Sequence, residues 1–157
     1  EMESGYDKVN WTEFKLNGET PSRRAYHASF FYDDHFYIYG GHDIREGAKD
    51  TLWRVDMSHK NKEPQWERLT FKKHKSPGAI AYHTMTLKGH LAYLIGGSAL
   101  GDDSTRDYIL DVSTLEWDVV ERRGASAPPS IDEHSANLHG DQIVVFGGNI
   151  SGFKSNA

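Results

Sequence analysis

The 157-residue sequence has no cysteine and no long hydrophobic run. Without cysteine, the chain can form no disulfide scaffold, no cysteine-ligated zinc site and no thiol nucleophile. No stretch approaches the roughly 18 apolar residues of a membrane-spanning helix, and the first ten residues lack the basic and apolar regions of a signal peptide. We therefore expect a soluble protein without a membrane segment, and we predict a cytoplasmic location.

The sequence is also poor in hydrophobic residues, at 37%, with a mean hydropathy of -0.69. This is low for one deep core, so burial must be shallow or layered. Aromatic residues reach 12% and there are 15 glycines, a balance that favours strands and turns. The net charge of -5 gives no overall attraction to nucleic acid or to an anionic membrane. An all-β fold is predicted.

A glycine pair follows a short apolar run at three places, after "HFYIY", "HLAYLI" and "QIVVF". A proline lies 19 positions before the first glycine of each pair, and a histidine lies 13 positions before it. The pairs and their companions are Gly40-Gly41, Gly96-Gly97, Gly147-Gly148, Pro21, Pro77, Pro128, His27, His83 and His134. Recurrence at fixed offsets indicates an internal repeat.

Each unit continues with two more segments of strand character. The third strands are expected at 52–56 and 108–112, and Trp66 and Trp117 begin the fourth. The segment "WTEFKL" from Trp11 has the pattern of a fourth strand that belongs to a preceding unit. Units of four strands at a period near ~50 residues are typical of propeller blades.

The motif "PSRRAYH", followed by "YIYGG", an aspartate after the third strand and a closing Trp66, resembles the kelch repeat. The resemblance implies a fragment of a kelch-type β-propeller made of four-stranded antiparallel blades. The expected parts are an outer strand of a preceding blade (11–20), a first full blade (21–71), a second full blade (77–121) and the inner half of a third (128–157).

These units are too few to close a ring, because closed propellers use roughly 4 to 8 blades. We expect the missing arc to come from a longer protein to which this chain belongs, from another chain, or from self-association through the open sheet edges. The repeats also depart from the family pattern. The first repeat has the family's arginine at Arg24, whereas the second and third have isoleucine at the equivalent positions 80 and 131. Those isoleucines either form an exposed apolar strip or pack between blades.

The recurring residues are predicted to be structural. Glycine permits sharp turns and close approach of blades, and aromatic residues fill the space between them. A metal shared by the three histidines is not expected, because bonds of about 2 Å cannot span adjacent blades. The structural set is Gly40, Gly41, Gly96, Gly97, Gly147, Gly148, His27, His83, His134, Trp66 and Trp117.

In kelch proteins, two sets of loops lie on the same face around the central opening. The resemblance therefore nominates glycine loops at 42–50, 98–106 and 149–157, and proline loops at 21–26, 77–82 and 128–133. Their charges of both signs suit a charged peptide. The candidate partner-binding residues are Arg23, Arg24, His42, Asp43, Arg45, Glu46, Ile80, Tyr82, Asp102, Asp103, Arg106, Asp132, Glu133 and Asn149.

The predicted function is a protein-interaction scaffold that binds a protein or peptide through this face, without enzymatic activity, cofactor or metal. Nucleic acid is not an expected partner, because the basic run at 60–75 spans an insertion, a strand and a loop. The alternative is an iron- or copper-dependent enzyme built on a kelch propeller. The stretches "IDEH" at 131–134 and "GHD" at 41–43 contain suitable ligand types.

Overall fold

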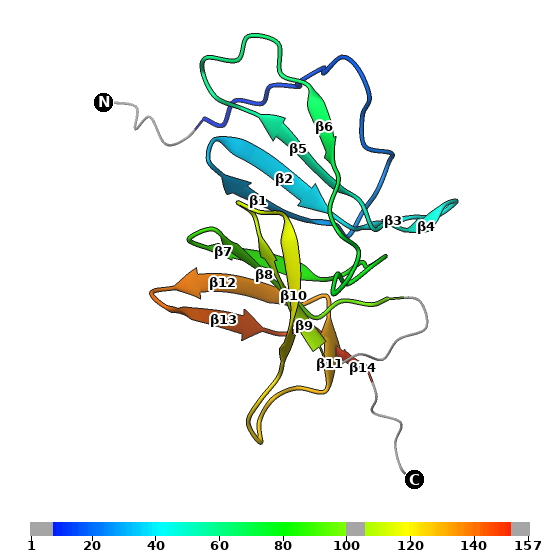
Figure 1. Cartoon of the computed structure of the whole chain (residues 1–157), viewed down its shortest axis with the longest axis vertical. Coiled ribbons are helices and arrows are strands. Elements are labelled where there is room, and N and C mark those ends of the chain that lie inside the picture. The colour runs from blue at the N-terminus through cyan, green and yellow to red at the C-terminus, as the bar shows by residue number, and fades with distance from the viewer. Residues whose placement is uncertain (1–7, 100–105, 152–157) are drawn as a thin grey trace.

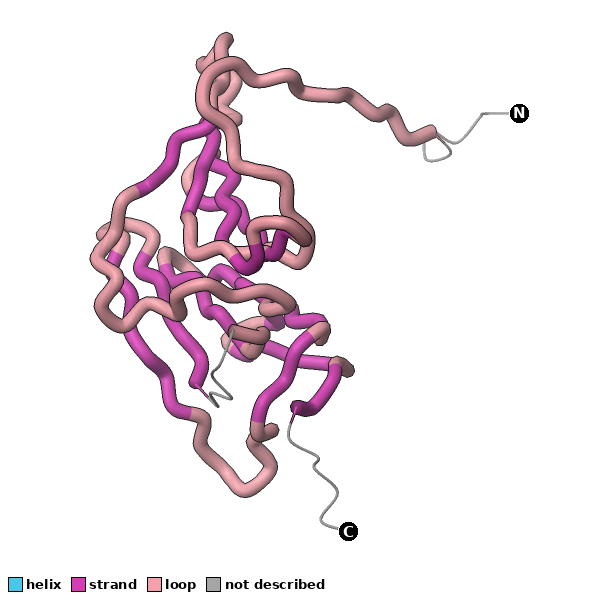
Figure 2. Tube along the Cα trace, turned by 90° about the vertical axis from the view of Figure 1, so that its right-hand side faces the viewer, coloured by secondary structure: helices cyan, strands magenta, loops and turns pink. Residues whose placement is uncertain are grey.

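The computed structural model describes residues 8–99 and 106–151, which form strands and loops only (Figure 1, Figure 2). Within these residues, no helix has the length and apolar character to cross a membrane. Two four-stranded sheets and a hairpin lie next to one another, and the described strands do not close a ring. The predicted all-β fold, a partial propeller of antiparallel blades, is confirmed.

Blade 1 is a sheet of four antiparallel strands in the order β1-β2-β5-β6. The strands are β1 (Ala28–Tyr32), β2 (His35–Tyr39), β5 (Leu52–Asp56) and β6 (Trp66–Leu69). β-Branched and aromatic residues alternate along them, as strands with two different faces require. The expected strands at 35–39 and 52–56 coincide with β2 and β5.

Blade 2 repeats this arrangement in the order β7-β8-β9-β10. Its strands are β7 (Thr84–Lys88), β8 (Leu91–Ile95), β9 (Arg106–Asp111) and β10 (Glu116–Glu121). The third strand begins earlier than the predicted 108–112, because Glu121 at the end of β10 pairs with Arg106 and extends the ladder.

The half-blade, which we call blade 3, is the hairpin of β12 (Ser135–His139) and β13 (Gln142–Phe146). Four short strands were not predicted, and they lie in the loops after the glycine pairs and before the repeated histidines. They are β3 (His42–Asp43), β4 (Gly47–Ala48), β11 (Ser130–Asp132) and β14 (Asn149–Ser151). The residue bounds proposed for whole blades stay predictions.

The core lies between blades 1 and 2. The β1-β2-β5 register places Tyr39 beside Ala28 and Leu52 on one face of blade 1, and this face packs on Leu94 and Trp117 of blade 2. The Tyr39 and Trp117 rings are 4.9 Å apart. Each such buried side chain contributes about 1.5 to 3 kcal/mol. The first strands of the blades, β1, β7 and β12, are neighbours in that order.

The strand expected at 11–20 does not form. Asn17 makes one isolated bridge to Gln65, and Trp11 is 93% exposed. A strand needs a partner along its length, and no other described strand lies beside this segment to supply one. Instead, Phe14 and Leu16 line an apolar hollow on the face of blade 1 that points away from blade 2. The prediction of an outer strand there was therefore wrong.

Candidate functional site: the loop face

In each blade, backbone pairing joins the proline loop to the glycine loop. Ala25 bridges to His42, and Ala81 bridges to Ser98. In blade 3 the same contact extends into the β11-β14 ladder, where Asp132 pairs with Asn149. The short strands of both loop sets lie on one side of the molecule, to the right in Figure 1. We call this side the loop face.

The first two glycine pairs set the distance to the following blade. A Cβ on the first glycine would meet the following blade: at Gly40 it would lie 2.5 Å from the carbonyl oxygen of Ile80, and at Gly96 it would lie 2.1 Å from that of Ile131. The second glycine, Gly41 or Gly97, donates its N–H to that same carbonyl at 2.8 Å. Backbone therefore packs on backbone, a contact that only glycine permits.

The isoleucine alternative is decided in favour of packing between blades. The side chains of Ile80 and Ile131 are only 4% and 6% exposed. Because their carbonyl oxygens bind the glycine of the preceding blade, these residues are held inside the junction. The interpretation of Ile80 as an exposed partner contact was therefore wrong.

The residue before each repeated histidine has a left-handed backbone. Tyr26, Tyr82 and Glu133 have φ values of 60°, 63° and 54°. The N–H of Tyr82 donates to the carbonyl of Tyr26 at 3.0 Å, and the N–H of Glu133 donates to the carbonyl of Tyr82 at 3.0 Å. This conformation strains the backbone of a residue other than glycine, and strained residues are frequent at functional sites. We call these three residues the left-handed row.

Two side chains of the left-handed row, Tyr26 and Glu133, are exposed, and Tyr82 is half-buried between them. The rings of Tyr26 and Tyr82 stack with centroids 4.2 Å apart, and Tyr26 is 54% exposed. The exposed Glu133 carboxylate accepts a hydrogen bond of 2.7 Å from Nδ2 of Asn149. Tyr26 was absent from the predicted site, although its fixed place beside His27 in the repeat could have identified it.

The predicted arginines differ in how they are held. Arg24 Nη1 donates to the carbonyl of Gly40 and to Oγ1 of Thr51, each at 3.1 Å. Burial is the main cause that lowers its pKa, with Arg68 adding to this and Glu46 opposing it. Arg24 thus anchors the turn of its own blade. Arg23 and Arg45 are exposed and make no ion pair or side-chain hydrogen bond with other described residues.

The acidic side chains of the first glycine loop shape that loop. Oδ1 of Asp43 accepts hydrogen bonds from the backbone N–H groups of Arg45 and Glu46 at 2.8 and 2.9 Å. These two bonds lower the pKa of Asp43. Glu46 in turn forms an ion pair with Lys49. The carboxylates therefore stabilise the turn between β3 and β4.

The remaining candidates occupy different positions. His42 and Asp132 are half-buried in β3 and β11, whereas Asn149 is exposed in β14. Arg106 is exposed at the start of β9. Asp102 and Asp103 lie outside the described residues. The loop face therefore brings together candidates from the first and third blades, with Tyr82 between them.

Two of the repeated histidines are buried at the blade junctions. Nε2 of His83 donates to the carbonyl of Tyr39 at 3.2 Å, and Nε2 of His134 lies 2.9 Å from Oγ1 of Thr84. The third, His27, is exposed. Among residues 8–99 and 106–151, no group of three or more histidine, aspartate or glutamate side chains is placed to hold a metal ion.

Acidification is expected to destabilise the fold through His83. Burial lowers the pKa of this side chain from 6.5 to about 4. Between these values the unfolded chain binds a proton that the folded chain does not, so stability falls as the pH falls. We expect a loss of about 2 kcal/mol in the free energy of unfolding from pH 7 to pH 5, measured by urea denaturation.

The variant His83→Gln separates this contribution from that of other groups. Glutamine keeps an N–H donor for the Tyr39 carbonyl but carries no titrating group in this range. Its loss of stability over the same interval should be smaller than that of the unsubstituted chain by about 2 kcal/mol. Equal losses would show that His83 is not the group responsible.

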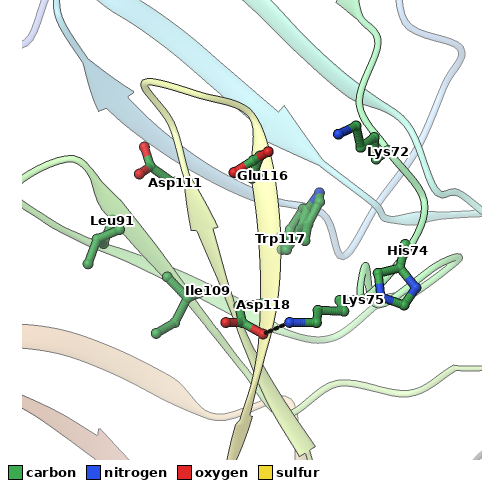
Figure 3. Close-up of a pocket in the computed structure, with 9 residues that line it drawn as sticks. All are labelled: Lys72, His74, Lys75, Leu91, Ile109, Asp111, Glu116, Trp117 and Asp118. Atoms are coloured by element: carbon green, nitrogen blue, oxygen red, sulfur yellow. Dashed lines mark hydrogen bonds and ion pairs between the residues drawn. The ribbon is translucent and has the colours of Figure 1, made fainter.

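A second hollow lies over the outer strands of blade 2 (Figure 3). Nζ of Lys75 binds Oδ1 of Asp118 across it at 2.9 Å. Its other lining residues come from the loop after β6 and from β8, β9 and β10: Lys72, His74, Leu91, Ile109, Asp111, Glu116 and Trp117. The ion pair neutralises part of its charge, and no repeated loop feature converges there.

Comparison with known proteins supports the architecture. A family profile described as the KLHDC2/KLHL20/DRC7 Kelch-repeats domain matches residues 5–149. Kelch domain-containing protein 3 of Rattus norvegicus is 32% identical over 136 residues, which is 85% of this chain and 34% of that protein. The Homo sapiens protein of the same name is 31% identical over the same length.

Acyl-CoA-binding domain-containing protein 5 of Arabidopsis thaliana is 25% identical over 153 residues, or 96% of this chain and 23% of that protein. The chain thus spans about a third or less of the length of these curated relatives. Because the profile covers nearly all of the chain and two full blades have the expected topology, the chain belongs to the kelch-repeat family.

Proposed function

We propose that this chain is a protein-interaction scaffold that binds a partner protein or peptide through its loop face. Kelch repeats commonly serve protein interaction, and the proposal extends that role to a particular surface. The observation that carries it is the left-handed row, which holds Tyr26, Tyr82 and Glu133 in strained conformations, with Tyr26 and Glu133 exposed and Tyr82 half-buried. We propose no catalytic step for it.

The structure of the loop face suits an extended peptide. The backbone of this face is held in place, because N–H groups of the glycine pairs and of the left-handed row donate to carbonyl oxygens of neighbouring blades. Exposed Arg23 and Arg45 offer guanidinium groups on the blade 1 side, and Glu133 offers a carboxylate on the blade 3 side. Loops on a rigid scaffold are where binding residues concentrate. A partner segment of mixed charge would complement both ends.

Charge reversal at the two free arginines tests this surface. The double variant Arg23→Glu and Arg45→Glu should reduce binding of peptides selected by the unsubstituted chain from a displayed random library. Loss of two exposed charge contacts should weaken binding by about three- to thirtyfold. Binding can be measured by fluorescence anisotropy of the selected peptides.

The matched control is Lys60→Glu with Lys62→Glu. These exposed lysines lie in the loop between β5 and β6, at the opposite end of the strands, and the change in net charge is the same. The control should bind as the unsubstituted chain does. Equal weakening by both double variants would mean that net charge, and not the loop face, governs binding.

We further propose that another segment or another chain completes the ring, this chain's own copies included. Apolar side chains are accessible on both end blades, which supports the proposal. Phe31 on blade 1 is 57% exposed and Phe146 on blade 3 is 80% exposed. Exposed apolar area of this kind is typical of a surface that another protein segment covers.

A further inference from the structure

The last residue of the left-handed row differs in type from the first two. Its first two members, Tyr26 and Tyr82, are aromatic and stack, whereas the third, Glu133, is a carboxylate at the equivalent position of the next blade. The backbone hydrogen bond from Glu133 N–H to the Tyr82 carbonyl holds the two residues side by side. A half-buried aromatic ring and an exposed carboxylate therefore belong to neighbouring residues of the loop face, and the two groups interact electrostatically.

The electrostatic environment of this end of the row is negative. Burial raises the pKa of the Tyr82 hydroxyl, and the nearby groups Tyr26, Glu133 and Asp132 raise it further. Arg122, a cation that acts on the adjacent His134, has partners along both edges of its guanidinium. It forms an ion pair with Asp107 and donates to the carbonyl oxygens of Pro128 and Pro129.

Asn149 fixes the carboxylate in place. Its Nδ2 binds Oε2 of Glu133, and no other described side chain donates to that carboxylate. The second oxygen, Oε1, is thus left to accept a hydrogen bond from a ligand. A neutral amide does not cancel the negative charge, so the site keeps its preference for a cation.

We propose that Tyr82 and Glu133 form a subsite for a basic side chain, arginine or lysine, of an extended partner segment. The cation lies against the tyrosine ring and forms an ion pair with the free oxygen of Glu133. Aromatic faces attract cations, and arginine also stacks on them. This inference rests on the proposed function, and it specifies the chemistry of the partner at one end of the loop face.

The test uses selection of peptides from a displayed random library by the immobilised chain, followed by sequencing of the selected pool. We expect arginine or lysine to be enriched at one shared position of the selected peptides. Replacing that residue by citrulline or norleucine in a synthetic peptide should weaken binding about three- to tenfold. Binding should also weaken as salt is raised, since the carboxylate is exposed.

The variant Glu133→Gln assigns the preference to this site. Glutamine keeps an acceptor for Asn149 but removes the charge, so selection by the variant should lose the enrichment of basic residues. Glu121→Gln, which removes an exposed carboxylate of β10, is the matched control and should keep the enrichment. Unfolding curves of both variants establish that each is folded.

Three results would overturn the inference, and they separate it from the proposed function. Peptides that bind the loop face, as shown by the arginine double variant, but carry no shared basic position overturn this subsite alone. Enrichment that persists in Glu133→Gln also overturns it alone. A library that yields no bound peptide overturns the subsite and the proposed function together.

Discussion

Replacing Gly96 with alanine is expected to destabilise the fold by about 2 to 5 kcal/mol. The new Cβ would lie 2.1 Å from the carbonyl oxygen of Ile131 and 2.7 Å from Cε1 of His134, and the φ of +63° adds strain for a residue with a side chain. Backbone cannot give way as a flexible side chain can, so blades 2 and 3 must separate. Urea denaturation measures the change in free energy of unfolding.

Gly147→Ala is a matched control for this prediction. Gly147 has the same repeat position and a φ of +72°, but no atom of the described residues lies within 4 Å of its added Cβ. Only backbone strain of about 1 to 2 kcal/mol is expected there. The difference between the two variants therefore measures the close contact between blades. If both variants lose the same stability, the contact at Gly96 imposes no constraint.

The variant Arg122→Ala is expected to lower the free energy of unfolding by about 2 to 4 kcal/mol, measured by urea denaturation. Its guanidinium binds both oxygens of Asp107 at 2.7 and 2.8 Å, and the two side chains are only 9% and 17% exposed. The same group donates to the carbonyls of Pro128 and Pro129, so it ties the third proline loop to blade 2. Its removal would leave the Asp107 carboxylate half-buried without a counter-ion.

Lys75→Ala provides the comparison for an exposed pair. Lys75 and Asp118 form an ion pair at 2.9 Å, but their side chains are 48% and 67% exposed. Loss of this ion pair should lower the free energy of unfolding by less than about 1 kcal/mol. A double-mutant cycle of Arg122→Ala with Asp107→Asn then isolates the pair itself. A coupling energy near zero would contradict the role given to this ion pair.

The inner strands could be predicted from sequence because local and tertiary signals agree there. The runs before the glycine pairs combine β-branched and aromatic residues with a sharp stop, and β2 and β13 match two of these runs residue by residue. The kelch resemblance then implied four-stranded antiparallel blades, and two full sheets of this kind form. Repetition gave three copies of each signal, which made the pattern clear.

The errors occurred where a residue depends on neighbours that sequence does not show. Whether Ile80 is exposed depends on how closely Gly40 approaches it, which no local pattern reveals. The segment from Trp11 has strand character but lacks a partner to pair with. Tyr26, Tyr82 and Glu133 share a left-handed backbone although they have no residue type that favours it.

The hydrogen bonds donated by Gly41 and Gly97 each run from one blade to the blade that follows it. The N–H of Gly41 is satisfied by blade 2 and that of Gly97 by blade 3, so each blade is completed by the one that follows it. A blade moved into another protein without the following blade would have a glycine N–H group without a hydrogen-bond acceptor at its most closely packed point. A repeat that is moved into another protein should therefore be exchanged together with the loop of the next blade that accepts this hydrogen bond, because the bond crosses the boundary between blades.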